Sequence, residues 1–165
     1  MITKENKIKN SKYILSSIKR IAFQVYEINI GEEYLVIVGV GERGRLLSEM
    51  LGQALVSISD LKLKYVNLTI DKAKPYNNIK SNVSLENLKN QSIVIVDDVL
   101  NTGNTLIHAV SYFLQIPVKQ IKTAVMVNRN HKKFPIKADF KGLSLSTSVN
   151  EHITVRLKGN NSGIY

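Results

Sequence analysis

Apolar residues change their spacing along the chain, and each change marks a predicted element. Isoleucines and a valine recur at helical spacing over residues 14–28, which predicts an amphipathic helix. Residues 35–38 are then apolar without interruption, as expected of a strand that is covered on both faces of a parallel sheet. Helical spacing returns over residues 46–55. The pattern therefore predicts helix, buried strand and helix in succession.

The same alternation continues to residue 127. Residues 66–70 alternate as a strand does, residues 93–96 form a second apolar run, and residues 106–114 form a helix stopped by Pro117. A last strand is predicted over residues 121–127. This order predicts an α/β fold with a mainly parallel, twisted sheet flanked by helices. Ligands of such sheets bind at the carboxyl ends of the strands.

One connection is unusually long. The 22 residues between Ile70 and Ile93 are broken only by a short predicted turn at residues 84–88. Unstructured loops beyond about 12–15 residues are commonly lids or binding loops. We therefore expect residues 71–92 to form a flexible lid beside the ligand edge.

Composition is typical of one cytoplasmic domain. The chain has 165 residues, and we expect a single domain over residues 1–165, with a loose basic N-terminus at residues 1–10. The 0 cysteines exclude a disulfide scaffold, a thiolate zinc site and a cysteine nucleophile. The apolar run at residues 35–40 is far shorter than the ~18 residues of a membrane span, and no signal peptide is visible. We expect a soluble protein with no membrane partner.

The net charge of +10 comes from 23 Lys and Arg against 13 Asp and Glu, and it is unevenly spread. Basic side chains gather in residues 1–20 and 129–141. Such clusters attract polyanions, either nucleic acid, a membrane surface or a small phosphorylated substrate. The alternative is that they form only a solvated face.

The first glycine-containing turn has the spacing of a dinucleotide-binding fingerprint. Gly39, Gly41 and Gly44 lie between a predicted strand and helix. That fingerprint also requires an acidic residue about 20 positions on, at the end of the second strand. Asp60 precedes that strand and Asp71 lies too far along, so the pattern argues against a dinucleotide site.

The second turn carries a more specific pattern. Two carboxylates, Asp97 and Asp98, end an apolar strand, and a loop of hydroxyl, amide and glycine residues follows at residues 101–105. Backbone N–H groups at a helix N-terminus would cradle a dianionic phosphate. Gly103 lets the backbone close around it.

The carboxylates suit a different part of a ligand. Carboxylates that only accept hydrogen bonds, such as Asp97 and Asp98, suit vicinal ribose hydroxyls, which they would bind either directly or through Mg²⁺. The alternative is that Asp98 or Thr102 only caps the helix in a solvated turn.

Residues 93–105 resemble the 5-phosphoribosyl-1-pyrophosphate (PRPP) motif of type I phosphoribosyltransferases, which is an apolar run followed by Asp-Asp-x-x-x-Thr-Gly-x-Thr. Residues 38–44 look like the pyrophosphate loop of that family. Residues 127–142, with 146–148, are similar to the tail of the pyr operon attenuation proteins that have uracil phosphoribosyltransferase activity. The resemblance implies a type I phosphoribosyltransferase-like fold, in which residues 128–150 form a small hood on the base side.

The resemblance also implies an enzyme that transfers the phosphoribosyl group of PRPP to a nucleobase, with uracil the expected base. It makes Asp97, Asp98 and Arg43 catalytic and places Mg²⁺ at the two carboxylates, through water or directly. The implied PRPP-binding residues are Asp97, Asp98, Val99, Leu100, Asn101, Thr102, Gly103, Asn104 and Thr105. Those implied to bind the base are Val127, Asn128, Arg129 and Asn130.

Pyrophosphate would lie on the first turn and the lid. The implied residues are Gly41, Glu42, Arg43, Gly44, Lys72 and Lys74. The family's loop carries a non-proline cis peptide at this turn. Glu42 fits only if its carboxylate points outward, and lysines in a loop often serve solubility alone.

The resemblance further implies a homodimer or a larger homo-oligomer. It also leaves an alternative function open, namely an RNA-binding regulator of a pyrimidine operon with weak or no catalysis. Lys19 and Arg20 lie where that subgroup's RNA-contacting helix is charged.

Overall fold

A computed structural model describes residues 6–165. The helices are α1 (Ser11–Glu27), α2 (Gly41–Ile58) and α3 (Asn104–Phe113), with a short 3₁₀ helix, η1 (Leu85–Leu88). The strands are β1 (Lys9–Asn10), β2 (Tyr34–Val40), β3 (Lys62–Thr69), β4 (Lys80–Ser81), β5 (Ser92–Leu100), β6 (Gln120–Arg129), β7 (Phe140–Leu145), β8 (Val155–Arg156) and β9 (Gly163–Ile164).

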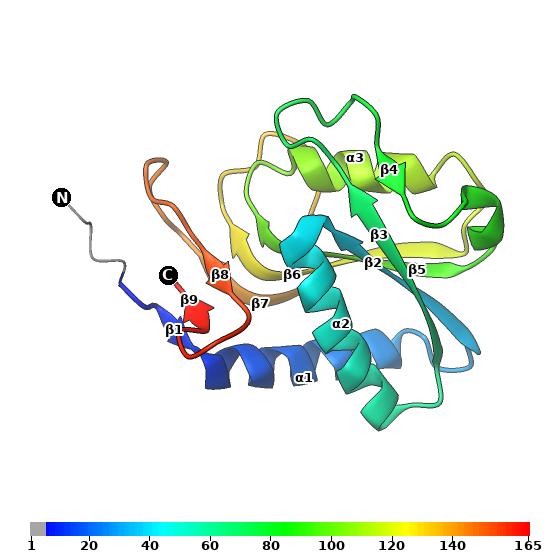
Figure 1. The fold of residues 1–165 in the computed structure, drawn as a ribbon, viewed down its shortest axis with the longest axis horizontal. Helices are drawn as coiled ribbons and strands as arrows, with labels where there is room; N and C mark the ends of the chain where they lie inside the picture. The colour runs from blue at the N-terminus through cyan, green and yellow to red at the C-terminus, as the bar shows by residue number, and fades with distance from the viewer. Residues whose placement is uncertain (1–5) are drawn as a thin grey trace.

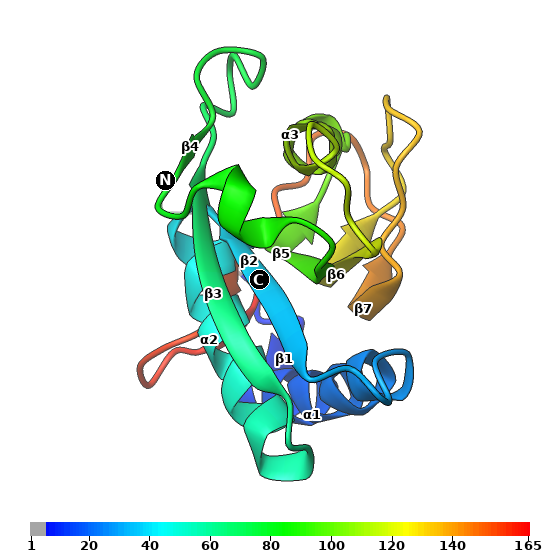
Figure 2. The same cartoon turned by 90° about the vertical axis from the view of Figure 1, so that its right-hand side faces the viewer.

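The main sheet has the order β4-β3-β2-β5-β6-β7 and is parallel except for β4. α1 and α2 cover one face and α3 covers the other (Figures 1 and 2). The predicted α/β architecture is thus confirmed. From β2 the chain adds β3 on one side, and from β5 it adds β6 on the other. The sheet therefore has its topological switch between β2 and β5, where α/β sheets bind ligands.

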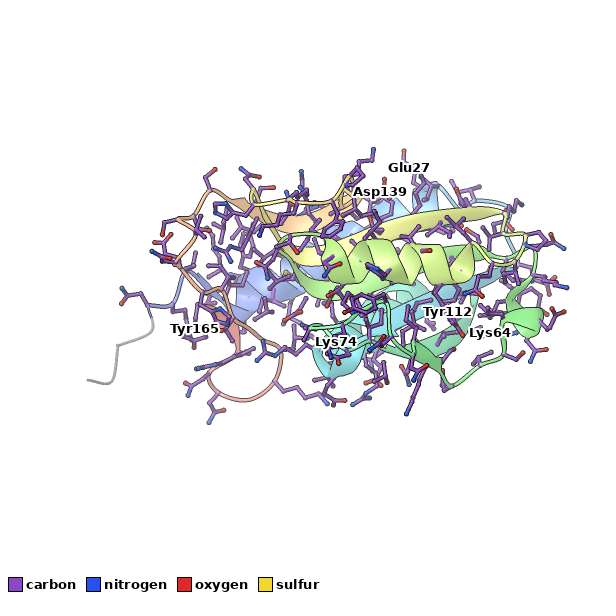
Figure 3. The ribbon with its side chains drawn as sticks, turned by 90° about the horizontal axis from the view of Figure 1, so that it is seen from above. Glu27, Lys64, Lys74, Tyr112, Asp139 and Tyr165 are labelled. Atoms are coloured by element: carbon purple, nitrogen blue, oxygen red, sulfur yellow. The ribbon has the colours of Figure 1, made fainter. Side chains whose placement is uncertain are left out.

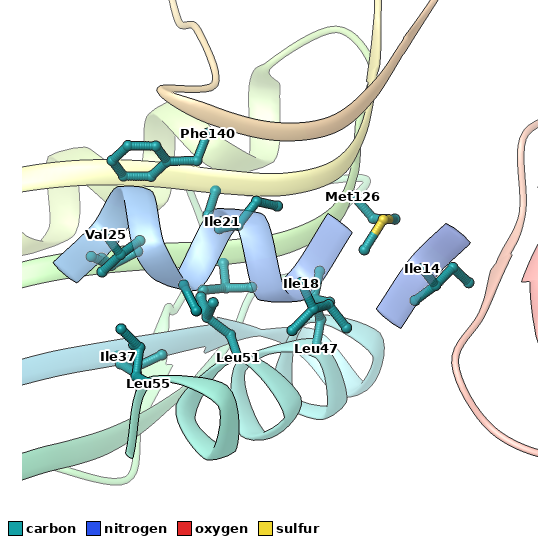
Figure 4. Packing of buried hydrophobic residues seen from close by; sticks show 14 of the residues in the cluster. Ile14, Ile18, Ile21, Val25, Ile37, Leu47, Leu51, Leu55, Met126 and Phe140 are labelled. Carbon is teal, nitrogen blue, oxygen red and sulfur yellow. The ribbon is translucent and has the colours of Figure 1, made fainter. Parts of the chain in front are cut away.

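The uninterrupted apolar strands are buried on both faces, as predicted. In β2, Leu35 and Ile37 pack toward α1 and α2, whereas Val36 and Val38 pack toward α3. Figure 4 shows the first of these layers, in which Ile14, Ile18, Ile21 and Val25 of α1 meet Leu47, Leu51 and Leu55 of α2 over the sheet. Burial of this kind stabilises by about 1.5–3 kcal/mol for each large aliphatic side chain.

A second, small sheet joins the two ends of the chain. β1 pairs antiparallel with β9, which pairs with β8, and the Ile8 amide donates to the Ile164 carbonyl at 2.7 Å. The prediction of a loose N-terminus is therefore wrong for residues 8–10, because their backbone groups are paired there. Residues 1–5 of that prediction lie outside the described part of the chain.

The predicted lid is largely ordinary structure. β4 pairs with β3, and η1 places Leu88 fully inside the core beside α3. Because Leu88 is anchored in this way, residues 80–92 form part of the scaffold rather than a structureless loop. The remainder is residues 71–79, which are mostly exposed apart from the buried Pro75, and Lys74 in Figure 3 belongs to them.

The predicted hood is also partly built into the sheet. β7 pairs parallel with β6, with Ala124 opposite Phe140, and Phe140 packs in the α1 layer (Figure 4). Residues 140–145 are therefore an edge strand, and only residues 130–139 and 146–150 of the predicted hood remain as connecting segments.

Candidate functional site

The second glycine-containing turn lies at the switch point of the sheet. β5 continues through both carboxylates to Leu100, and α3 begins at Asn104 after an N-cap at Gly103. Gly103 has φ +87°, a left-handed conformation that side chains other than glycine rarely adopt, and a Cβ there would lie 2.3 Å from Ile136 Cγ2. Glycine is thus required by both backbone and packing.

This turn borders a cavity of about 260 Å³ at the N-terminus of α3. Its lining consists of Lys72, Asp97, Val99, Leu100, Asn101, Thr102, Gly103, Asn104, Thr105, Leu106 and Val125. The five residues predicted to cradle a phosphate therefore surround one cavity. The positive end of the α3 dipole faces the same region.

Asp97 is 5% exposed and lies in the wall of the cavity. Burial, and then the neighbouring charge of Asp98, raise the pKa of the Asp97 carboxyl well above its ordinary value, although the charge of Lys72 opposes the shift. Its oxygen accepts the Asp98 amide at 2.9 Å. A buried carboxylate with so few partners is suited to a ligand that brings hydroxyl donors or a cation.

Asp98 is also buried, but it contacts the first turn. Its Oδ2 lies 3.5 Å from Nη1 of Arg43, whose side chain is 55% exposed. The alternative in which Asp98 caps α3 is wrong, because Gly103 is the N-cap and the Asp98 carboxylate pairs with Arg43 instead. Thr102 Oγ1 does accept the Asn104 amide, at 3.3 Å. The pair Arg43–Asp98 thus connects the two predicted halves of the site.

The first turn passes directly from β2 into α2. Gly41 has φ +65°, and no cis peptide occurs in residues 6–165, so the cis bond implied by the resemblance is not present. A left-handed glycine makes the turn instead. The other two glycines serve packing: a Cβ on Gly39 would lie 2.5 Å from Arg45 Cα, and one on Gly44 would lie 2.7 Å from the Val96 carbonyl oxygen.

Glu42 points away from the site. Its carboxylate is paired with Arg45 at 2.7 Å and is largely exposed. Arg45 also binds Glu49 at 2.5 Å, so the three charges form a chain along the outer face of α2. The pairing lowers the pKa of Glu42, chiefly through the hydrogen bond from Arg45. The carboxylate therefore does not block an anion at this turn.

The two lid lysines are placed differently. Lys72 lines the cavity and acts electrostatically on Asp97, whereas Lys74 is exposed and is not part of the cavity wall. Asp71 Oδ1 accepts the amides of Ala73 and Lys74 at 2.9 and 3.4 Å, which turns the chain between the two lysines. The structure brings Lys72 alone of this pair to the predicted site.

The residues that were predicted to face the base lie at the carboxyl end of β6 and directly after it. Val127 is fully buried, and Asn130 is exposed and donates to Ser146 Oγ at 3.0 Å. Asn128 is buried, and its Oδ1 has no hydrogen-bond partner. Arg129 is buried and its guanidinium is held by other protein groups. Of these side chains, Asn128 is the one with a buried acceptor that has no partner.

Residues 101–105, here called the cavity loop, have a support that no sequence motif indicates. The amides of Lys133 and Phe134 donate to the Thr102 carbonyl at 2.8 and 3.2 Å, and Ile136 packs against Gly103. Residues 133–136 lie in the tail whose resemblance was noted, but the chain separation of about 30 residues gives no local signal of the contact.

The profile of the phosphoribosyl transferase domain matches residues 5–158. The chain belongs to the phosphoribosyltransferase family. It is 35% identical to the bifunctional protein PyrR of Leuconostoc mesenteroides over 146 residues, covering 84% of this chain and 83% of the relative. It is 36% identical to PyrR of Fusobacterium nucleatum over 154 residues, covering 88% and 86%. The type I phosphoribosyltransferase resemblance, with PyrR as the subgroup, is thus confirmed.

Solved phosphoribosyltransferases share the fold. The hypoxanthine phosphoribosyltransferase of Trypanosoma cruzi in complex with the product IMP superposes with a TM-score of 0.79 at 15% identity, covering 99% of this chain and 94% of that one. The enzyme from Staphylococcus aureus gives a TM-score of 0.75 at 17% identity, covering 90% and 81%. The likeness at these identities concerns architecture alone.

No helix within residues 6–165 is long and apolar enough to cross a membrane. The same residues contain no group of three or more His, Asp and Glu side chains that could hold a metal ion by themselves. Asp97 and Asp98 nevertheless fit Mg²⁺ in its usual mode, in which one or two carboxylates hold an ion that a phosphorylated substrate also binds.

Proposed function

We propose that the protein transfers the 5-phosphoribosyl group of PRPP to a nucleobase, with uracil as the base. The observation that carries the proposal is the cavity at the N-terminus of α3, where residues 101–105 and the buried Asp97 line one wall. A phosphorylated sugar supplies what each part lacks: a dianion for the amides, and hydroxyls for the carboxylates.

In the proposed reaction a ring nitrogen of the base bonds to C1′ of the ribose as the C1′–O bond to pyrophosphate breaks. Pyrophosphate leaves with the bonding electron pair, and the N–H proton of the base passes to solvent. No side chain has to form a covalent intermediate, so the residues act by positioning the reactants and stabilising charge. When bound, Mg²⁺ would neutralise the leaving pyrophosphate.

Each residue has a proposed part in this reaction. Residues 101–105 bind the 5′-phosphate, and Asp97 and Asp98 bind the ribose hydroxyls and hold Mg²⁺ with the substrate. Arg43, which is half exposed beside Asp98, binds pyrophosphate with the backbone of Gly41 and Gly44. Lys72 approaches the same ligand from the exposed segment.

The choice of uracil rests on the resemblance of residues 127–142 to the pyr operon attenuation proteins. The unpartnered Oδ1 of Asn128 supports a base that presents an N–H donor, because a buried acceptor without a partner costs about 1–3 kcal/mol. The imide N–H of uracil is such a donor.

The test is product formation with a panel of bases. Protein, PRPP and Mg²⁺ are incubated with uracil, cytosine, hypoxanthine, guanine and adenine in separate reactions, and nucleoside monophosphate is quantified. We expect UMP from uracil. Product from hypoxanthine but not from uracil would contradict the base assignment, and no product from any base would contradict the enzyme.

A second candidate function, RNA binding, is favoured by one contact. Arg20 of α1 donates to the carbonyls of Lys141 and Gly142 at 3.0 and 3.1 Å, so the two basic segments of the sequence meet at the junction of α1 and β7. A joined basic surface attracts polyanions. Binding of RNA that depended neither on sequence nor on nucleotides would contradict a regulatory role.

We further propose a homo-oligomer, either a dimer or a larger assembly, from the same resemblance. Light scattering at micromolar concentration checks it, and a mass of one 18.5 kDa chain would contradict it.

A further inference from the structure

Arg129 ends β6 and is buried although it is charged. Its guanidinium donates four hydrogen bonds, all to oxygens of uncharged groups. The acceptors are Asn101 Oδ1 at 2.9 Å, Thr147 Oγ1 at 3.0 Å, the Ser148 carbonyl at 3.1 Å and the Glu151 carbonyl at 2.8 Å. A buried charge is tolerated only when it is hydrogen-bonded in this way, so the arrangement depends on all four acceptors.

These acceptors come from two separate segments. Asn101 belongs to the cavity loop, whereas the other three lie in residues 147–151, after β7. Asn130 and His131 also connect the end of β6 to the chain after β7. Asn130 contacts Ser146 Oγ, directly before the second segment, and His131 contacts the Thr147 carbonyl within it. Of these three side chains, Arg129 is the one that also reaches the cavity loop.

The cavity loop needs a fixed conformation to bind an anion. Several of its backbone N–H groups must point at one phosphate, and Gly103, the most adaptable residue, lies in the middle. Asn101 is exposed, yet its side-chain oxygen is held by the rigid fork of a buried arginine. This contact fixes the start of the loop, as the amides of residues 133 and 134 fix Thr102.

We propose that Arg129 is a positioning residue, which holds the cavity loop in its anion-binding conformation through Asn101 and is itself anchored on residues 147–151. The identity of the ligand rests on the proposed function. The positioning role replaces the base contact expected from the sequence, because Nε, Nη1 and Nη2 all have acceptors within the protein.

Three variants and one double variant separate this role from a direct contact. Asn101→Ala removes the loop end of the connection at an exposed position. Arg129→Lys keeps the charge but loses the fork that serves several acceptors. Ser146→Ala is the matched control, since it breaks the neighbouring tie from Asn130 and leaves Arg129 untouched.

Hydrogen exchange of single amides reports loop order without any ligand. The Lys133 and Phe134 amides report on Thr102, and the Ser148 amide, which donates to Glu151 Oε2 at 2.6 Å, reports on the anchoring segment. We expect Asn101→Ala to speed exchange at Lys133 and Phe134 alone, Arg129→Lys to speed it at all three, and Ser146→Ala to leave Lys133 and Phe134 unchanged. Unchanged exchange at these two amides in Asn101→Ala would overturn the proposal, whether or not Arg129→Lys folds.

Binding of inorganic phosphate, and of PRPP with Mg²⁺, is then measured by calorimetry. We expect roughly tenfold weaker binding in Asn101→Ala and in Arg129→Lys, the loss typical of one hydrogen bond to a charged group. The double variant, Asn101→Ala with Arg129→Lys, should bind phosphate no more weakly than the weaker-binding single variant, because both changes break the same connection. Additive losses, or full phosphate affinity in Asn101→Ala, would overturn the role. Failure of the proposed reaction would instead show as a wild-type protein that makes no nucleotide while the exchange results stand.

Discussion

Two glycine-containing turns lie at the same edge of the sheet, and they differ in what their polar groups contact. In the β2–α2 turn the helix follows the strand at once, and Glu42 and Arg45 are paired on the outer face. In the β5–α3 turn residues 101–103 separate strand from helix, a cavity opens beside them, and Asp97 is buried at its wall. In the first turn Glu42 and Arg45 are thus paired with each other, whereas the second turn places a buried carboxylate beside an open cavity.

The difference shows that a glycine pattern does not identify a ligand site. Gly39 and Gly44 permit close approach of backbone to backbone, while Gly103 supplies a left-handed conformation beside the cavity. The spacing that resembles a dinucleotide fingerprint is therefore explained by close packing at Gly39 and Gly44 and by the left-handed turn at Gly41. Among the ion pairs found in residues 6–165, the pair of Arg43 and Asp98 is the one that joins the two turns.

The largest effect is expected from removing both carboxylates of the second turn. Asp97→Asn with Asp98→Asn should lower PRPP-dependent turnover by roughly a hundredfold or more, since the charge that orients the ribose and Mg²⁺ is lost. Circular dichroism serves as the control for folding. Turnover equal to that of the wild type would remove the assignment of these residues to the sugar and the ion.

A pair of glycine substitutions tests the contrast between the turns. Gly103→Ala should weaken phosphate binding roughly tenfold, because a left-handed alanine costs about 1–2 kcal/mol and its Cβ meets Ile136. Gly44→Ala should mainly lower Tm, by about 2–10 °C, because its Cβ meets the Val96 carbonyl. Calorimetry measures phosphate binding and thermal melts measure Tm for both variants. Weaker phosphate binding in Gly44→Ala but not in Gly103→Ala would contradict the contrast between the turns.

Because Asp97 is buried, its charged form lowers the stability of the folded protein. Its raised pKa means that the folded state binds the proton more tightly than the unfolded state, so stability falls as pH rises from the ordinary value of 3.8 toward the raised one. Asp97→Asn should therefore raise Tm at pH 7 by a few degrees, about 2–4 °C for each kcal/mol, and the gain should vanish below pH 3.8. A lower Tm for this variant at pH 7 would show that the carboxylate is stabilised in the folded protein.

The smallest effect is expected at Glu42. Because its carboxylate is exposed and pairs with Arg45, Glu42→Gln should change KM for PRPP by less than about twofold. Steady-state kinetics at low ionic strength measure it. A large fall in KM would mean that Glu42 repels pyrophosphate and faces the site.

The elements of this fold were readable wherever the apolar pattern was periodic or unbroken. The helix over residues 14–28 and the buried runs of β2 and β5 matched the structure within a few residues, because apolar side chains dominate their buried faces. β3 begins at Lys62, four residues before the predicted 66, because its exposed first half alternates with lysines. β4 and η1 were too short to give a period, so the segment containing them was predicted as a lid.

The site was predictable as far as it is local in sequence. Residues 97–105 run from the end of β5 into α3, and their spacing alone placed the carboxylates beside the loop that lines the cavity. The contacts of Arg129 with Asn101 and of Lys133 with Thr102 join segments about 30 residues apart, and only the parallel pairing of β5 with β6 brings them together. The outward direction of Glu42 likewise depends on Arg45, a partner that the glycine pattern does not indicate.

The central claim is that the cavity at the N-terminus of α3 holds the 5′-phosphate of PRPP. A crystal structure with PRPP and Mg²⁺ tests it most directly. We expect the 5′-phosphate within hydrogen-bond distance of the backbone amides in residues 102–105, with the ribose hydroxyls toward Asp97 and Asp98. A 5′-phosphate bound elsewhere, with the cavity loop empty, would contradict the account.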